Sequence, residues 1–277
     1  MGIFAKILAK MKGDEASEIN PARDNEQETF YADSQDAAMR EAAKKARQTF
    51  KYFWRELYWD RRRIVPALDM AMVKLPFSQD DGREVEYMWV DDVEFDGEKI
   101  YGRLVNEPDT LTNIKKGDEI EAPLDEVSDW IFVSESKSFG AFGVQAMRSK
   151  MSEQQRVRHD EAWGVNFGDF DDILVVVGQK EHPQNLIEHP MSINGKDKFE
   201  KFIKENSREA SLADENGYTL LHKEAIAGNL TTIKILLQNF ADKNAQTDDG
   251  KTALEFASIM GWEHIVKELK LNQKIWI

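Results

Sequence analysis

The stretch Asp214-Glu-Asn-Gly-Tyr-Thr-Leu-Leu-His222 decides the fold of the C-terminal part of the chain, because its pattern returns 33 residues later. The matching positions pair Gly217 with Gly250, Thr219 with Thr252, Leu221 with Leu254, Gly228 with Gly261, Ile233 with Val266 and Leu236 with Leu269. A repeat of this length is typical of a turn followed by two antiparallel helices. Such helices bury their apolar faces only by stacking on neighbouring repeats.

The period and the residues at its fixed positions resemble the ankyrin repeat. The match departs from the usual pattern at Leu220 and Ala253, where proline is common, at Phe240, where glycine normally closes the second helix, and at Glu255. His222 falls on the ankyrin histidine, whose implied role is to hydrogen-bond neighbouring turns. The resemblance implies recognition of a protein by the turns, or fingers, and the inner helices. The expected contact residues are Asn216, Tyr218, Lys223, Ile226, Asp248, Asp249 and Lys251.

Residues Lys196 to Asn206 lie one period before the second helix of the first full repeat and carry Phe199, Phe202 and Ile203. We expect a degenerate capping helix here. Two full repeats are too few to be stable alone. We therefore predict that the stack docks on the preceding domain through this helix.

A long helix is predicted near the start of the chain, where apolar residues recur at alternating steps of four and three. The stripe consists of Met39, Ala43, Ala46, Phe50, Phe53 and Leu57. The larger apolar residues lie toward the end of the stripe, so we predict that the C-terminal half of the helix is buried. Short strands are expected to follow, at 71–75, 85–95, 99–105, 119–122 and 127–133, with Asp96-Gly97 as a hairpin turn. The fold class expected is α+β, an antiparallel-sheet domain with a long N-terminal helix, followed by an all-α repeat stack.

Three segments are expected: a flexible N-terminal segment at 1–33, an α+β domain at 34–180 and a repeat domain at 181–277. Met1 to Lys12 has apolar residues on one helical face and lysines on the other, so it is a candidate for touching a membrane surface. Ile275-Trp276-Ile277 is an apolar tail that must pack on the last repeat or on a partner.

The composition narrows the possible functions. The 51 acidic and 37 basic residues give a net charge of −14, which disfavours general nucleic-acid binding. The same charge either steers a basic partner or only keeps the protein soluble. The absence of cysteine excludes disulfides and suits a reducing cytoplasm. The sequence contains no run of 18 or more apolar residues, so no membrane-spanning helix is predicted.

Few residues are candidates for a catalytic, metal-binding or ligand-binding role. His159, Asp160 and Glu161, with His182 and His189 downstream, are metal-ligand types, but three consecutive residues on a helix point in different directions. Phe139-Gly-Ala-Phe-Gly143 is predicted to be a turn, because it lacks the context of a phosphate-binding loop. Five tryptophans suit a core better than a ligand pocket: Trp54, Trp59, Trp89, Trp130 and Trp163. We expect the triplet Arg61-Arg-Arg63 to form internal ion pairs.

Residues 35 to 135 resemble the YegJ-like family, small bacterial domains to which no activity is attached. The resemblance rests on Phe53-Trp-Arg-Glu-Leu57, Ala71-Met-Val-Lys74, Met88-Trp-Val90, Leu104-Val-Asn-Glu-Pro108, Lys116-Gly-Asp118 and Ser128-Asp-Trp130. Such domains, and ankyrin proteins, resemble components found beside bacterial toxins, where they would act as immunity proteins.

The sequence therefore predicts a cytoplasmic, non-enzymatic binding protein without a cofactor. Its partner is expected to be a protein, in the sharpest form a basic toxin such as a nuclease that it neutralises. The alternatives are a metal-dependent enzyme that uses His159, Asp160 and Glu161, and a membrane-surface adaptor that uses Met1 to Lys12.

Overall fold

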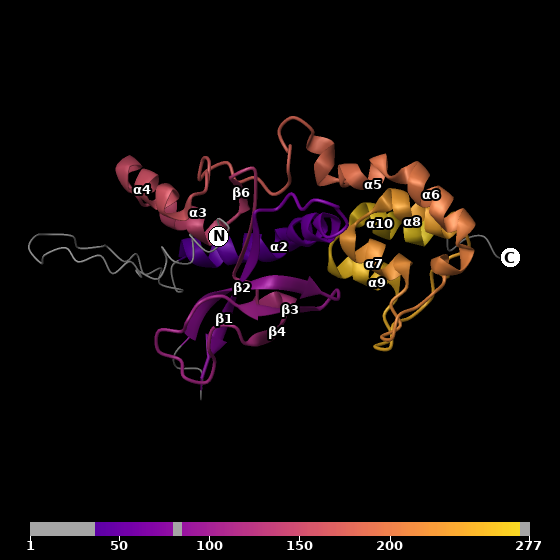
Figure 1. Ribbon diagram of the computed structural model, residues 1–277, viewed down its shortest axis with the longest axis horizontal. Helices are drawn as coiled ribbons and strands as arrows, with labels where there is room; N and C mark the ends of the chain where they lie inside the picture. The colour runs from indigo at the N-terminus through magenta and orange to yellow at the C-terminus, as the bar shows by residue number, and fades with distance from the viewer. Residues whose placement is uncertain (1–36, 80–84, 272–277) are drawn as a thin grey trace, which may run out of the picture.

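The computed structural model describes residues 37–79 and 85–271 (Figure 1). The predicted amphipathic segment, the linker after it and the tail at 275–277 lie outside these residues. The first domain contains α2 (Ala37–Asp60), β1 (Met70–Ser78), β2 (Val85–Phe95), β3 (Lys99–Leu104), β4 (Glu119–Pro123), β5 (Asp129–Ser134), β6 (Lys137–Gly140), α3 (Phe142–Arg148) and α4 (Glu153–Trp163). The second contains α5 (Pro190–Asn194), α6 (Lys196–Glu205), α7 (Leu220–Ala227), α8 (Leu230–Gln238), α9 (Ala253–Ile259) and α10 (Glu263–Leu271).

The predicted α+β class is confirmed. Within the described residues, the strands form one sheet in the order β4-β3-β2-β1-β5-β6, and every neighbouring pair is antiparallel. The hairpin turn between β2 and β3 also lies where Asp96-Gly97 predicted it. Its geometry is set by the Asp96 carboxylate, which accepts hydrogen bonds from the backbone N–H groups of Glu98 and Lys99, both at 2.8 Å.

One strand was missing from the prediction. Phe139 and Gly140 belong to β6, so interpreting 139–143 wholly as a turn was wrong. The turn itself is short, with Ala141 at φ +57 just before α3. The strand needs its glycine, since a Cβ at Gly140 would lie 2.4 Å from the Trp130 ring.

Helix α2 lies between the sheet and the repeats (Figure 1). As predicted, its C-terminal half is buried, with Phe50 and Phe53 fully inaccessible to solvent. The burial goes further than the stripe predicted, because Arg55, Glu56 and Asp60 are buried as well. A helix covered on several sides explains this difference: one face packs on β5 and another on α7, while the segment 185–189 ahead of the repeats covers Arg55 and Glu56.

The ankyrin geometry is present in detail. Gly217 and Gly250 turn the two fingers at φ +79 and +75, and the N–H of Asp248 donates to the carbonyl of Asn216 across them at 3.1 Å. His222 has the structural role predicted for it. Its Nδ1 accepts from the N–H of Thr219 at 3.0 Å, and its Nε2 bonds to the carbonyl of Ala245 at 2.9 Å.

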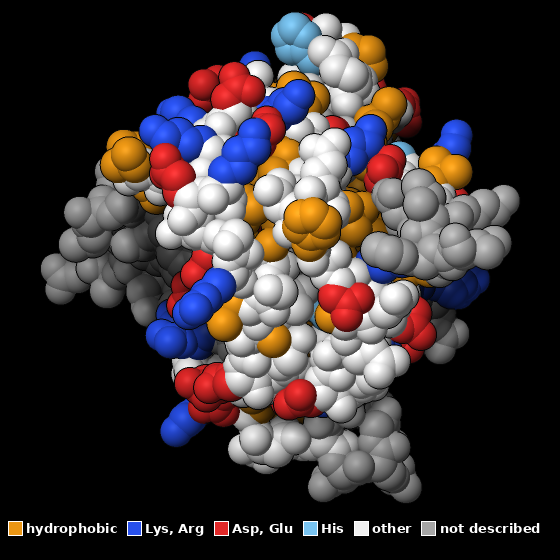
Figure 2. All heavy atoms as spheres, turned by 90° about the vertical axis from the view of Figure 1, so that its right-hand side faces the viewer, with side chains coloured by type: hydrophobic (Ala, Val, Ile, Leu, Met, Phe, Trp, Pro, Cys, Tyr) orange, Lys and Arg blue, Asp and Glu red, His pale blue; other side chains and the backbone are white. Residues whose placement is uncertain are grey.

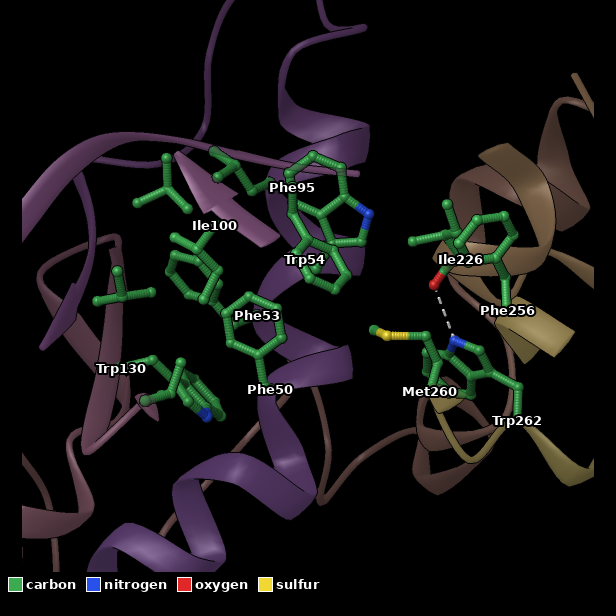
Figure 3. Close-up of a cluster of buried hydrophobic side chains, with 14 of the residues drawn as sticks. Phe50, Phe53, Trp54, Phe95, Ile100, Trp130, Ile226, Phe256, Met260 and Trp262 are labelled. Carbon is green, nitrogen blue, oxygen red and sulfur yellow. Dashed lines mark hydrogen bonds between the residues drawn. The ribbon is translucent and has the colours of Figure 1, made fainter. Parts of the chain in front are cut away.

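The route by which the stack docks differs from the prediction. A helix does form at the expected capping position, but α6 packs on α8, and the main contact with α2 is made by α7. The fingers and inner helices are thereby turned toward the first domain. One continuous cluster of buried apolar residues runs from the sheet, through α2, to α7 and α9 (Figure 3).

Candidate protein-binding site

A cavity of about 380 Å³ opens where the two domains meet. Its walls come from the end of α2, from the β2–β3 hairpin, and from the first ankyrin finger with α7. The lining residues are Trp54, Tyr58, Arg61, Arg62, Glu94, Phe95, Asp96, Asp214, Asn216, Tyr218, Lys223 and Ile226. Neither domain alone forms this cavity.

The floor of the cavity is apolar. Trp54 is 5% exposed and Ile226 is 3% exposed, while Phe95 packs edge-on against the Trp54 ring with centroids 5.6 Å apart. In Figure 3, Trp54 lies between the phenylalanine cluster and Ile226, with its indole nitrogen directed toward the ankyrin side. Among the residues that the structure describes, none accepts a hydrogen bond from that nitrogen.

The β2–β3 hairpin holds one side of the cavity against the inner helices. A Cβ added at Gly97 would lie 2.5 Å from Phe256 and 3.0 Å from Ile226, so only glycine permits this approach. An ion pair between Lys251 and Glu98, at 2.6 Å, fixes the turn to the second finger.

A buried polar network closes the other side. Glu224 on α7 accepts hydrogen bonds from the Tyr58 hydroxyl at 2.7 Å and from the Asn229 amide at 2.7 Å, and pairs with Arg62 at 3.0 Å. Burial, followed by the Glu224 charge, raises the pKa of Tyr58 well above its usual value. Trp59 extends the network by donating its indole N–H to Asn229 at 3.0 Å.

The rim carries charges that are already paired. Arg61 pairs with Glu94, and Lys223 pairs with Asp214 at 2.7 Å. Arg63 pairs with Glu56 at 3.3 Å, so the prediction of internal ion pairs for Arg61, Arg62 and Arg63 is confirmed. Burial, followed by the surrounding carboxylates, raises the pKa of Tyr218 above its usual value.

The residues predicted for partner contact fall into two groups. Asn216, Tyr218, Lys223 and Ile226 line the cavity, although the buried Ile226 belongs to its floor. On the second finger, Asp248 and Asp249 are exposed, and Lys251 is partly covered by its pairing with Glu98.

Sequence reasoning did not select the contributions of α2 and the hairpin to this site. Trp54 and Tyr58 carried a usable signal, since they are aromatic, four residues apart and beside the apolar stripe instead of within it. Nothing local in the sequence placed Phe95 or Asp96 next to a finger more than a hundred residues later.

The candidate metal ligands do not form a site. His159 Nδ1 lies 2.9 Å from Asp160, whose carboxylate makes two bonds to Arg148, at 2.9 and 2.6 Å. His182 and His189 line a different cavity, beside α2. Across 37–79 and 85–271, no group of three His, Cys, Asp or Glu side chains is arranged to hold a metal ion.

The end of the molecule formed by the ankyrin stack carries hydrophobic side chains near the middle of the face and charged ones around them (Figure 2). The exposed large hydrophobic residues of the stack are Ile193, Phe202, Leu212, Phe240, Ile259 and Leu271. In the part of the chain that the structure describes, no helix has the length and hydropathy to cross a membrane.

Two family descriptions match the chain. Residues 36–167 match "Uncharacterized protein conserved in bacteria (DUF2314)", and residues 189–276 match "Ankyrin repeats (3 copies)". The "Putative ankyrin repeat protein NMB1133/NMB1171" of Neisseria meningitidis serogroup B is 49% identical over 243 residues, which is 87% of this chain and 96% of that protein. The chain belongs to this family of bacterial DUF2314–ankyrin proteins.

A smaller relative matches only the first domain. The "Uncharacterized protein YegJ" of Escherichia coli K12 is 29% identical over 79 residues, which is 28% of this chain and 50% of that protein. The YegJ-like resemblance is thus confirmed, as is the fusion to ankyrin repeats. For a DUF2314–ankyrin protein, the repeats indicate a protein-binding module.

Proposed function

We propose that this protein binds one protein partner through the cavity and the fingers beside it, and that the partner is a bacterial toxin which it neutralises as an immunity protein. The observation that carries the binding proposal is the interdomain cavity. It combines an apolar floor with a polar rim, an arrangement found in protein-recognition sites. An inhibitor of this kind acts by covering its partner, so it needs no catalytic group of its own.

The charge of the protein supports a basic partner. The chain carries a net charge of −14, and Asp248 and Asp249 stand exposed on the second finger. Opposite charge raises the rate of encounter, because long-range attraction steers the two surfaces together. A nuclease toxin with a basic active-site surface fits this chemistry. With the proposed domain boundaries, 34–180 and 181–277, each domain contributes residues to the lining of the cavity.

The proposal is tested first by capture of the partner with the full chain in the native cell, followed by expression of that partner alone. A partner that kills cells alone, and fails to kill them when this protein is co-expressed, supports the immunity role. A captured partner that is harmless alone contradicts toxin neutralisation.

Association kinetics then test the finger. The double variant Asp248→Lys/Asp249→Lys should associate about tenfold more slowly than wild type at low salt, with the difference shrinking as salt is added. The matched control, Glu161→Lys/Asp171→Lys, makes the same change in net charge at exposed positions in and after α4. Equal slowing in both variants means that only net charge matters. An unchanged rate in the first removes the second finger from the interface.

A further inference from the structure

The two edge strands of the sheet, β6 and β4, differ in how their outer backbone groups are satisfied (Figure 1). At β6 these groups are hydrogen-bonded within the protein. The N–H of Ser138 donates to the carbonyl of Asn166 at 3.0 Å, and that of Gly140 donates to the carbonyl of Leu174 at 2.8 Å. In the part of the chain that the structure describes, no hydrogen bond from another segment reaches the outer side of β4. One edge of the sheet is therefore closed, and the other is open.

The register between β3 and β4 fixes which backbone groups face outward. The ladder begins and ends on hydrogen-bonded positions: the N–H of Leu104 donates to the carbonyl of Asp118 at 2.9 Å, and the N–H of Leu124 donates to the carbonyl of Glu98 at 3.0 Å. Between these ends the register is unbroken. Because hydrogen-bonded and non-hydrogen-bonded pairs alternate in an antiparallel ladder, the even-numbered residues of β4 bond to β3. The odd-numbered residues turn their backbone groups outward.

The open edge of β4 offers both backbone groups and two distinct side-chain faces. The N–H and carbonyl groups of Glu119 and Glu121 point outward, as does the carbonyl of Pro123. These three side chains are exposed on one face of the sheet, whereas Ile120 and Ala122 are buried on the other, at 8% and 6% exposure. Since side chains alternate along a strand, an added strand would place polar residues beside the glutamates and apolar residues beside Ile120 and Ala122.

The charges from this edge to the second finger select a basic partner strand. Lys99 pairs with Glu121, and Lys251 pairs with Glu98, so both cations are already engaged. Opposite charges on neighbouring strands attract, and like charges directly opposite repel. A second copy of β4 would bring glutamates against glutamates, whereas a strand with lysine or arginine on that face is complementary. The exposed acidic residues of this surface are Glu119, Glu121, Asp125, Glu126, Asp248 and Asp249.

The open edge is continuous with the binding surface proposed above. The backbone carbonyl of Glu98 ends the β3–β4 ladder, and the carboxylate of the same residue pairs with Lys251 of the second finger at 2.6 Å. A strand that pairs with β4 and continues past Pro123 therefore reaches the second finger. The exposed carboxylates of Asp248 and Asp249 stand there.

We infer that an extended segment of the protein partner adds a strand to the sheet, antiparallel to β4, with lysine or arginine side chains beside Glu119 and Glu121. This inference rests on the proposed binding function and names the mode of contact. In such pairing the main-chain hydrogen bonds supply affinity, and the alternating side chains supply specificity. The antiparallel direction is that of every other pair in the sheet and is the more stable one. The shortness of β4, its glutamates and Pro123 keep the edge from pairing with another copy.

The test uses the full chain and a synthetic peptide in place of the partner. Acetyl-Lys-Val-Lys-Val-Lys-amide carries lysines for the glutamate face of β4 and valines for the apolar face. Backbone amide resonances of the protein are recorded by NMR during titration with this peptide. Those of Glu119 and Glu121 should move downfield with a Kd on the order of 1 mM, a value reasonable for a short fragment. Acetyl-Glu-Val-Glu-Val-Glu-amide is the charge control and should leave both resonances in place.

Two N-methylated versions of the lysine peptide separate backbone pairing from charge attraction. In the antiparallel arrangement the N–H of the central lysine faces β4, and the N–H of the second valine faces away. Methylation at the lysine removes a hydrogen bond and should weaken binding about fivefold, whereas methylation at the valine should change it less than about twofold. Equal losses, or a larger loss at the valine, overturn the inference. So does the absence of any shift of the Glu119 and Glu121 amides up to the solubility limit of the lysine peptide.

Two variants test the same contact from the protein side. Glu121→Pro removes one outward N–H at an edge that already carries Pro123, and Glu121→Gln keeps the N–H while removing the charge. The proline variant should weaken the lysine peptide about tenfold and the glutamine variant only about twofold. Equal weakening overturns the inference, as does a dimer of the free protein that Glu121→Pro dissociates, because a second copy would then occupy the edge. Failure to capture any partner in cells would instead count against the proposed function, and the two failures are therefore distinguishable.

Discussion

Gly97 is where the hairpin touches the ankyrin helices, and Gly97→Ala tests whether that contact exists in solution. Its φ of +112 is a conformation that alanine adopts only with strain, at a cost of about 1–3 kcal/mol. The new Cβ would also lie 2.5 Å from Phe256. Because Phe256 is fully buried, it cannot swing away, and such overpacking costs about 1–3 kcal/mol more. The total expected loss in the free energy of unfolding is about 2–6 kcal/mol.

Gly117→Ala is the matched control. Gly117 also has a positive φ, at +89, but apart from its own residue and its two chain neighbours no atom of the described chain lies within 4 Å of where its Cβ would be. Its variant therefore carries the strain without the clash, about 1–3 kcal/mol. Unfolding by urea, followed by circular dichroism and tryptophan fluorescence, gives both values. Gly97→Ala should lose about 1–3 kcal/mol more than Gly117→Ala. Equal losses would refute the packing of the hairpin on Phe256.

Three further changes test other parts of the structure. Arg62→Met should lower the free energy of unfolding, measured in denaturant titrations, by about 1–3 kcal/mol, because it leaves the buried Glu224 without its cation. The double variant with Glu224→Gln should recover part of that loss. Burial lowers the pKa of His222 in the folded protein. As pH falls below about 6.5, the unfolded chain therefore binds a proton more readily than the folded one, and the free energy of unfolding declines. His222→Gln should show a shallower decline of that free energy between about pH 7 and pH 5. Phe240 has a φ of +64 and is 93% exposed, so Phe240→Gly should stabilise the protein by about 1 kcal/mol in thermal unfolding, and a loss of stability would show that its ring packs on something.

The features that the sequence predicted are local ones. The period of 33 located the fingers through Gly217 and Gly250, and the alternation before Asp96-Gly97 located the hairpin. These patterns arise from turns and apolar faces, which depend on residues close together in the chain. The ion pairs of Arg61, Arg62 and Arg63 were also predictable, because a basic run in so acidic a chain finds carboxylates nearby.

The features that were missed depend on how distant segments meet. The stripe on α2 indicated one buried face, and the docking of the segment 185–189 on the helix explains why Arg55 and Glu56 are buried too. Burial lowers the pKa of Arg55 to about 10, and its guanidinium donates to the carbonyl groups of Asn185 and Ile187 ahead of the repeats. Charged residues in a helix are normally assigned to solvent, so no sequence pattern indicated this junction.

The same reasoning applies to the site. Tyr218 and Lys223 were predicted as contacts because ankyrin fingers and inner helices usually supply them, whereas Trp54 and Phe95 belong to the first domain, for which the sequence predicted no contact residue. The repeat pattern alone predicts an open concave surface. The structure instead places α2 and the hairpin against that surface and leaves a cavity shared by both domains.

Hydrogen–deuterium exchange of the full chain, free and saturated with its captured partner, tests the central claim of a shared binding surface most directly. The account predicts slower exchange on binding both in the hairpin peptide that contains 94–97 and in the finger peptide that contains 214–218. Protection confined to one domain, or found only in regions remote from the cavity such as α4, would contradict it.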